Sequence, residues 1–255
     1  MPNIRIGVQL HPQATSVQSL IGAAQKIDAS GVDTLFTWDH FFPLYGDKDA
    51  THFECYTLMA AWAAVTMRVE IGALVTCNSY RNANLLADMA RTIDHISSGR
   101  FILGIGAGWF ERDYSEYGYE FGSAPTRLAA LRAALPVIET RLAKLNPAPM
   151  RKMPLMIGGG GEKVTLRLTA QHATIWNFIG TPEEFKRKSA ILDDWCAKLG
   201  RNPAEIERSV LLNGPASADA WNAYVAVGAT HLIVAQSDPW DMAPVDTLVA
   251  WRAGL

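Results

Sequence analysis

The stretch that decides the fold is residues 92–119, TIDHISSGRFILGIGAGWFERDYSEYGY. Its helical opening ends in Ser97-Ser98-Gly99, and the apolar run Phe101–Ile105 follows, with glycine at positions 104, 106 and 108. An apolar strand that breaks into alternating glycines leaves bare backbone at its carboxyl end, where a flat or phosphorylated ligand can lie close. A tight turn after the strand also favours glycine, so the rest of the chain has to decide between these two interpretations.

Strand and helix patterns alternate along the whole chain, and the strands are mostly continuous apolar runs. Such strands indicate parallel pairing with both faces of the sheet buried. The eight predicted strands are Ile4–Leu10, Thr34–Trp38, Val69–Val75, Phe101–Ile105, Leu155–Ile157, Thr174–Asn177, Glu207–Leu212 and His231–Ala235. Eight strand–helix units predict a (β/α)8 TIM barrel that residues 1–255 form as a single domain, with an open doubly wound sheet as the main alternative.

Local signals mark several helix ends. Ser30-Gly31 is expected to end the first helix and Gly200 a later one, because glycine tolerates the left-handed conformation that follows many helices. Thr181-Pro182-Glu183-Glu184 combines a capping threonine, proline at the first helical position and acids in the first turn. Asp241 is predicted to begin a last helix that runs towards Ala253.

Composition and charge narrow the classes of function. Of the 255 residues, 49% are hydrophobic and 19% are charged, which favours a buried core over disorder. The formal net charge of −2 provides no basic surface for nucleic acid or an anionic membrane. Apolar stretches such as Leu58–Val65 are too short to span a bilayer, and Met1–Arg5 do not open a signal segment.

The cysteines and histidines show no metal-ligand spacing, so no metal site is predicted. Cys55, Cys77 and Cys196 are scattered, and we interpret them as free thiols in a reducing cytoplasm. The protein is therefore expected to be cytoplasmic.

In a barrel of this kind the functional groups gather beyond the carboxyl ends of the strands. Asp39-His40 follows the second strand, and histidine exchanges protons near neutral pH while an adjacent acid can orient it. The alternative is a histidine whose side chain only forms hydrogen bonds with the backbone of the loop. We take His40 and Asp39 as the candidate catalytic residues.

A second candidate site is the glycine run after the fifth strand. Gly158, Gly159, Gly160 and Gly161 precede Glu162 and a helix, and free amides at a helix amino end bind anions well. A flexible turn is the alternative, although four glycines cost much conformational entropy for a turn alone. We favour phosphate binding.

Other histidines and aromatic residues are less informative. His95, His172 and His231 lie within or beside regular elements and are interpreted as packing or surface residues, whereas the roles of His11 and His52 stay open. Aromatic side chains at strand ends are candidates for an apolar pocket around a planar cofactor: Trp38, Phe41, Phe42 and Trp109.

These residues resemble the bacterial-luciferase-like family, in particular its actinobacterial branch of oxidoreductases that use the deazaflavin coenzyme F420. The resemblance is carried by TLFTWDHFFPL (Thr34–Leu44), by Ile71–Gly118 with its IGALVTCNSYRN opening, by PLMIGGGGEKVTLRLTAQHATIWN (Pro154–Asn177), and by Thr181–Glu207. It covers most of residues 1–212 in order and becomes vague beyond Gly214.

The resemblance implies a luciferase-type (β/α)8 barrel, a homodimer, and a flavin or deazaflavin at the carboxyl end of the strands. His40 falls at the family's active-site histidine, and Leu74-Val75 falls where the family has a non-prolyl cis peptide behind the cofactor ring, followed by Thr76. The remaining implied cofactor contacts are Ala107, Gly108 and Trp109 beside the ring, and Gly158–Gly161 with Glu162 at the phosphate.

One departure from the family pattern concerns Asn146–Pro154, which is shorter than the family's segment between the same helix and strand. That segment commonly lies near the mouth of the pocket, so an open site, an altered substrate or weakened activity is expected. The leading hypothesis is hydride transfer between F420 and a small organic substrate. The alternatives are an FMN-dependent monooxygenase and a non-catalytic flavin or deazaflavin carrier.

Overall fold

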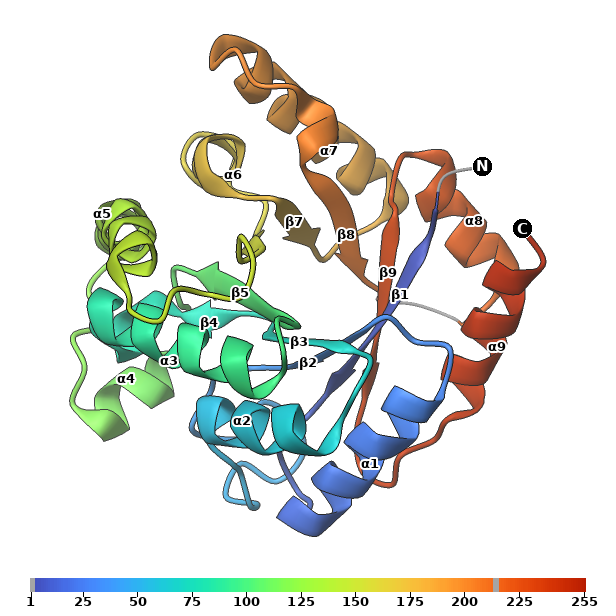
Figure 1. Cartoon of the computed structure of the whole chain (residues 1–255). Coiled ribbons are helices and arrows are strands. Elements are labelled where there is room, and N and C mark those ends of the chain that lie inside the picture. The colour runs from blue at the N-terminus through green and yellow to red at the C-terminus, as the bar shows by residue number, and fades with distance from the viewer. Residues whose placement is uncertain (1–2, 213–215) are drawn as a thin grey trace.

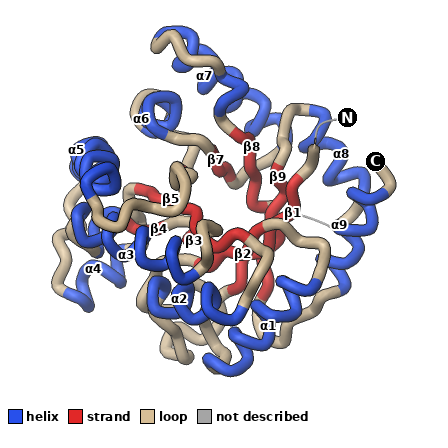
Figure 2. The backbone as a smooth tube through the Cα atoms, viewed as in Figure 1, coloured by secondary structure: helices blue, strands red, loops and turns tan. Residues whose placement is uncertain are grey.

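A computed structural model of the protein describes residues 3–212 and 216–255. Nine strands lie at the centre of these residues, and helices surround them (Figures 1 and 2). The strands are β1 (Arg5–Leu10), β2 (Thr34–Thr37), β3 (Glu70–Ala73), β4 (Thr76–Cys77), β5 (Phe101–Gly106), β6 (Leu155–Gly158), β7 (Ile175–Phe178), β8 (Glu207–Leu211) and β9 (His231–Gln236). The helices are α1 (Val17–Ala29), α2 (Cys55–Val65), α3 (Ala83–Ile96), α4 (Glu111–Tyr117), α5 (Ala124–Lys144), α6 (Thr165–His172), α7 (Pro182–Lys198), α8 (Ala218–Ala226) and α9 (Ala243–Ala253), with short 3-10 turns at Asn78–Tyr80 and Pro203–Glu205.

The strands close into a barrel. They are parallel and run in the order β3-β2-β1-β9-β8-β7-β6-β5-β4, with a further pairing between β3 and β5. The strands β3 and β4 occupy one place beside β5, because Ile71 pairs with Phe101 and Thr76 pairs with Ile105. The predicted (β/α)8 barrel is therefore confirmed, and the open sheet is wrong.

Apolar side chains pack in three clusters, the smallest of which contains Cys77, Tyr80 and Tyr114. The largest cluster combines side chains of the strands with side chains of the surrounding helices. A smaller cluster forms separately from it and is made by Phe36, Leu74, Ile102, Met156, Ile175 and Ile233. This separate packing gives the strand ends a rigid base.

Most of the predicted boundaries agree with the structure. Thr181 caps α7 through its hydroxyl, which accepts from the Glu184 N–H, while the Glu184 carboxylate accepts from the Thr181 N–H. Most strand ends differ from the prediction by at most a single residue, and two differences are larger. The predicted strand Val69–Val75 is split at Leu74-Val75, and the last helix begins at Ala243 because Asp241 accepts from the Ala243 N–H outside the helix.

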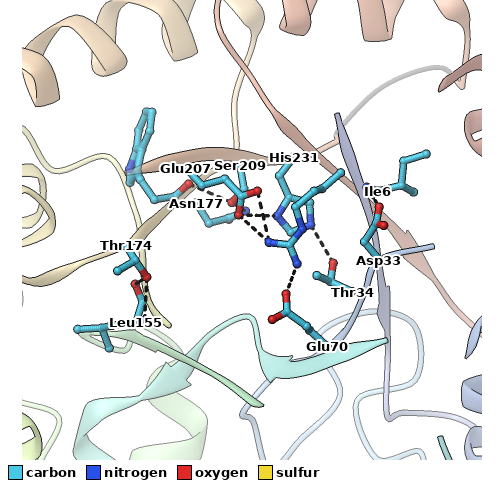
Figure 3. A network of polar contacts seen from close by, with 12 residues as sticks. Ile6, Asp33, Thr34, Glu70, Leu155, Thr174, Asn177, Glu207, Ser209 and His231 are labelled. Atoms are coloured by element: carbon cyan, nitrogen blue, oxygen red, sulfur yellow. Dashed lines mark hydrogen bonds and ion pairs between the residues drawn. The ribbon is translucent and has the colours of Figure 1, made fainter. Parts of the chain in front are cut away.

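A polar network occupies the amino end of the barrel (Figure 3). Arg5, at the start of β1, forms ion pairs with Glu70 at the start of β3 and Glu207 at the start of β8. The fully buried His231 faces Thr34 with Nε2 (2.8 Å) and Glu207 with Nδ1 (3.4 Å). These ion pairs connect β1, β3 and β8 at this end of the barrel.

The other histidines and the cysteines also lie in protein contacts. His95 Nε2 lies 2.8 Å from the Ala148 carbonyl oxygen, and His172 Nδ1 lies 2.8 Å from Glu139. The cysteines at 55, 77 and 196 are buried and free of disulfides. Across residues 3–212 and 216–255, no helix has both the length and the hydropathy required to cross a bilayer. In the same residues, no three His, Cys, Asp or Glu side chains gather as metal ligands would.

Candidate active site

The carboxyl ends of four neighbouring strand positions bring the predicted site residues to one edge of the barrel. His40 follows β2, Leu74-Val75 joins β3 to β4, residues 107–109 follow β5, and residues 158–162 end and follow β6. In a parallel barrel all of these ends face the same side. The polar network of Arg5 and His231 lies at the opposite end, so the two groups of residues are separated by the barrel interior.

A buried acid orients His40. The imidazole Nδ1 lies 2.6 Å from Oδ2 of Asp113, whose side chain is fully buried, while the His40 side chain is 11% exposed. Because a carboxylate only accepts hydrogen bonds, Nδ1 carries a proton and Nε2 is left for exchange. This is the arrangement of an orienting acid behind a proton-exchanging histidine.

Asp113 is held by several donors. Its Oδ1 accepts from the backbone N–H groups of Phe41 (3.0 Å) and Phe42 (3.2 Å), and its Oδ2 also accepts from the Tyr80 hydroxyl (2.8 Å). Burial, together with the nearby Cys77 and Asp113, raises the pKa of Tyr80 far above its ordinary value, so the phenol remains a donor. Hydrogen bonds from four groups stabilise a buried carboxylate that would otherwise be costly.

The predicted pairing of Asp39 with His40 is wrong. Asp39 is also buried, but its carboxylate accepts from Arg81 at 2.6 and 3.0 Å and from the Cys77 N–H at 3.0 Å. Arg81 also reaches Glu54 (2.6 Å). The adjacent residues Asp39 and His40 thus hold different partners. Asp39 therefore anchors the loop that follows β4, and Asp113 contacts His40.

The bulge at Leu74-Val75 has the predicted form, since the peptide bond between them is cis. Gln9 Nε2 donates to the Leu74 carbonyl oxygen at 2.8 Å. Leu74 is packed inside the barrel and Val75 is half-buried. Thr76 is fully buried and its hydroxyl lies 2.8 Å from the Tyr56 hydroxyl, so it supports the bulge from the protein side.

The glycines of β5 leave space for this bulge. A Cβ at Gly104 would overlap the Ala73 carbonyl oxygen, and one at Gly106 would lie 2.8 Å from Cγ2 of Val75. Gly158 of β6 faces the same valine, at 3.0 Å from Cγ1. The interpretation that Gly104 and Gly106 leave backbone bare for a ligand is therefore wrong, because β3 and Val75 fill that space.

The segment after β5 leads from the barrel to α4. Gly108 has a φ of +82°, and a Cβ there would overlap the Tyr114 hydroxyl. Ala107 and Gly108 are half-buried, whereas Trp109 is 62% exposed, with its ring centroid 5.7 Å from that of His40. Trp109 therefore offers an uncovered aromatic surface beside the proton-exchanging imidazole.

The glycine run after β6 has an open backbone. Gly159 has a φ of +113° and donates its N–H to the Asn177 carbonyl oxygen. Within residues 3–212 and 216–255, no protein acceptor contacts the N–H groups of Gly160 and Gly161. Helix α6 begins at Thr165 and has no side-chain cap. Unpartnered amides at an uncapped helix amino end suit an anion.

Glu162 does not point its charge into this loop. Its carboxylate accepts from Lys188 at 2.7 Å and from Arg187 at 2.6 Å, both of α7. These hydrogen bonds, Lys188 first, lower the pKa of Glu162 to about 2. One acid shared by two bases leaves this side of the loop with a net positive charge.

A separate cavity of about 700 Å³ lies at the amino side of β6, between α5 and α6. Its lining includes the short segment, through Ala148, Pro149 and Met153. The expectation that Asn146–Pro154 borders the active site is therefore wrong. The segment follows a helix that runs back to the amino end, so it lies away from His40.

Sequence reasoning missed Asp113 and Tyr80. Both lie within Ile71–Gly118, yet the sequence around neither residue indicates a function. Asp113 is one of several charged residues at the start of α4, and Tyr80 ends a short turn. Only the packing of α4 against the β2 loop brings the acid to the histidine.

The chain is similar to proteins of a known family. Residues 3–238 match the family model described as luciferase-like monooxygenase. A pyrimidine monooxygenase RutA from Stutzerimonas stutzeri (strain A1501) is 29% identical over 200 residues, which cover 69% of this chain and 51% of that protein. An F420-dependent glucose-6-phosphate dehydrogenase from Amycolatopsis mediterranei (strain U-32) is 26% identical, covering 63% and 53%. The chain spans about half the length of the curated relatives it matches.

A solved structure shares the fold over nearly its whole length. An F420-dependent secondary alcohol dehydrogenase, in complex with an F420-acetone adduct, superposes with a TM-score of 0.85. The match covers 97% of this chain and 98% of that chain at 16% sequence identity. At this identity the likeness establishes the barrel and not the activity.

Proposed function

We propose that this chain, which belongs to the luciferase-like monooxygenase family, is an oxidoreductase that transfers hydride between coenzyme F420 and a small organic substrate. The observation that carries the proposal is the His40–Asp113 contact of 2.6 Å, which leaves Nε2 of His40 available beyond the carboxyl end of β2. The F420-dependent relatives and the F420-dependent structural neighbour support this choice of cofactor.

The residues at this edge fit a flat ring with an anionic tail. Val75, Ala107 and Trp109 would hold the ring, because they follow the carboxyl ends of β3 and β5 and their side chains are half-buried or exposed. The amides of Gly160 and Gly161 would hold a phosphate at the amino end of α6, where Arg187 and Lys188 outweigh the single charge of Glu162. When bound, the deazaflavin supplies the hydride chemistry.

The chain's own residues supply the proton chemistry. In the direction of alcohol oxidation the substrate carbon loses a hydride while its hydroxyl loses a proton, and Nε2 of His40 accepts that proton. Asp113 stabilises the imidazolium that forms, since its carboxylate already binds the Nδ1–H. The exposed Trp109 ring lies edge-on beside His40 and gives this part of the site an apolar surface.

An FMN-dependent monooxygenase is the second candidate, and the similarity to RutA favours it. The glycine run suits either phosphate tail, so the backbone does not discriminate between the two cofactors. The reactivity of the reduced form towards oxygen separates them.

The test combines binding and turnover. The purified protein is titrated with F420 and with FMN by fluorescence quenching, and the reduced complex is then exposed to air. We expect selective F420 binding, slow reaction with oxygen, and turnover that falls about 10²–10⁴-fold in His40→Gln. His95→Gln is the matched control, because His95 contacts only the Ala148 carbonyl at the far end of the barrel. Binding of FMN alone with rapid oxygen consumption would favour the monooxygenase, and wild-type turnover in His40→Gln would remove His40 from the mechanism.

A further inference from the structure

Three aromatic rings lie close to His40. The ring centroids of Phe110, Trp109 and Trp38 lie 5.5, 5.7 and 6.1 Å from that of the imidazole. All three contacts are edge-on, with interplanar angles of 83°, 73° and 79°. The imidazole is therefore surrounded largely by aromatic side chains.

A second layer of rings lies behind Trp38. His11 stacks on the indole at 4.2 Å with an interplanar angle of 22°, and His52 lies parallel to it at 6.4 Å and 12°. Tyr45 completes this layer at 5.9 Å from Trp38 and is 64% exposed. The wall behind the histidine thus consists of planar groups from the loops after β1 and β2.

The two histidines of this wall are uncharged at neutral pH. Trp38 Nε1 donates to Nε2 of His52 at 2.9 Å, and a ring nitrogen that accepts a hydrogen bond carries no proton. Burial lowers the pKa of His11 to about 4 and that of His52 to about 4. The wall therefore contributes no positive charge.

Two arginines of this region are bound by groups of the protein. Arg81 binds Asp39 and Glu54. Arg112 donates to the Lys48 carbonyl (2.6 Å) and to Asp49 (2.8 Å) and lies over the Phe42 ring. The carboxylate of Asp113 behind His40 adds negative charge to the site. An anionic substrate would lose water here, find no free cation among these residues, and be repelled by Asp113.

We infer that the substrate of this site is an uncharged molecule with an apolar or aromatic body, and that phosphorylated or carboxylated substrates are excluded. This inference rests on the proposed function. It separates this chain from its relative named for glucose-6-phosphate, and it agrees with the acetone adduct held by the structural neighbour.

The experiment compares three secondary alcohols with the same skeleton: 1-phenylethanol, its para-carboxamide and its para-carboxylate. Oxidation is followed through the loss of the visible absorbance of oxidised F420. The carboxamide has the size and shape of the carboxylate, so the two differ mainly in charge. We expect kcat/KM for the carboxylate to be at least about tenfold below that for the carboxamide, because an unpaired charge is costly to bury.

A substitution in the protein tests the same inference. Tyr45→Arg places a cation at the exposed edge of the ring wall, and Tyr45→Gln is its uncharged control of similar length. The backbone carbonyl of Tyr45, which accepts from Gln13, is retained in both. We expect Tyr45→Arg to narrow the carboxamide-to-carboxylate ratio by about fivefold at low salt, through an attraction that acts over a Debye length. Tyr45→Gln should keep the wild-type ratio.

The outcomes distinguish this inference from the function on which it rests. Equal or better turnover of the carboxylate would overturn the inference while leaving F420 chemistry intact. Turnover of none of the three alcohols, with F420 still bound, would also overturn it. Failure to bind F420 in the separate titration would instead overturn the proposed function.

Discussion

His40 and Asp113, which are 73 positions apart, meet at 2.6 Å between the imidazole Nδ1 and the carboxylate Oδ2. The histidine comes from the loop after β2 and the acid from the first turn of α4. Because Asp113 also binds the N–H groups of Phe41 and Phe42, one buried carboxylate holds both the imidazole and the backbone that follows it. The loop and the proton-exchanging group are therefore positioned together.

Asp113→Asn removes the charge behind His40 while keeping the side-chain volume. We expect turnover to fall about 10²–10⁴-fold, because the amide does not stabilise the imidazolium and permits the wrong tautomer. Turnover is measured across a pH range, with thermal melting as the check on folding. Tyr80→Phe, which removes one donor from the same carboxylate, should cost less than Asp113→Asn. An unchanged pH profile in Asp113→Asn would assign this residue a purely structural role.

Asp39→Asn tests the other aspartate. Arg81 is 9% exposed and would keep only Glu54 as an ionic partner. We expect the free energy of unfolding to fall by about 2–4 kcal/mol, since breaking a buried ion pair leaves a charge uncompensated. Urea unfolding measures this loss. A large change in the pH profile of turnover, without loss of stability, would instead show that Asp39 takes part in proton transfer.

The glycine loop is best tested at Gly161. Gly160→Val would place its Cβ 2.5 Å from the Phe178 ring and disturb packing, whereas a Cβ at Gly161 meets the movable Thr165 hydroxyl at 2.7 Å. We expect Gly161→Ala to weaken F420 binding about tenfold, because the methyl group hinders close approach of a phosphate. Fluorescence titration and thermal melting are compared. Unchanged affinity with a lowered melting temperature would make the loop a turn and nothing more.

The pH dependence of stability follows from the lowered pKa of His52. Burial lowers this pKa from 6.5 to about 4 in the folded protein, so the unfolded chain binds more protons between these values. The free energy of unfolding should therefore fall as pH decreases from 6.5 towards 4. In His52→Gln, whose amide oxygen still accepts from Trp38, this slope should be smaller by about one proton. Urea unfolding of both proteins at several pH values measures the difference, and identical slopes would contradict the assignment.

Two glycine substitutions contrast packing with helix propensity. A Cβ at Gly104 overlaps the Ala73 carbonyl oxygen, which belongs to the backbone of β3, whereas a Cβ at Gly22 in α1 meets nothing within 4 Å. Gly104→Ala should destabilise the protein by about 3 kcal/mol. Gly22→Ala should stabilise it by about 0.5–1 kcal/mol. Denaturant midpoints measure both, and equal effects would show that β3 yields to the added methyl group.

Much of the fold could be predicted because its signals are local. Each predicted strand overlaps an observed one, and the cap at Thr181 forms as its sequence indicates. The resemblance to a family predicted the cis peptide at Leu74-Val75, which the apolar pattern of the strand does not reveal. The alternation of strands and helices predicted that His40 lies at the functional edge, since the carboxyl end of a parallel strand is known once the strand is known.

The sequence by itself determined the alternation of strands and helices, the barrel they form, and the edge at which chemistry is placed. These features follow from hydrophobic periodicity and from caps that act over three or four residues. The tertiary structure alone decided that Asp113 and not Asp39 contacts His40, that Gly104 serves β3, and that the short segment ending at Pro154 lies away from the site. The reason is physical: such contacts depend on how α4 and α5 pack and on where their loops return, and no local pattern encodes that.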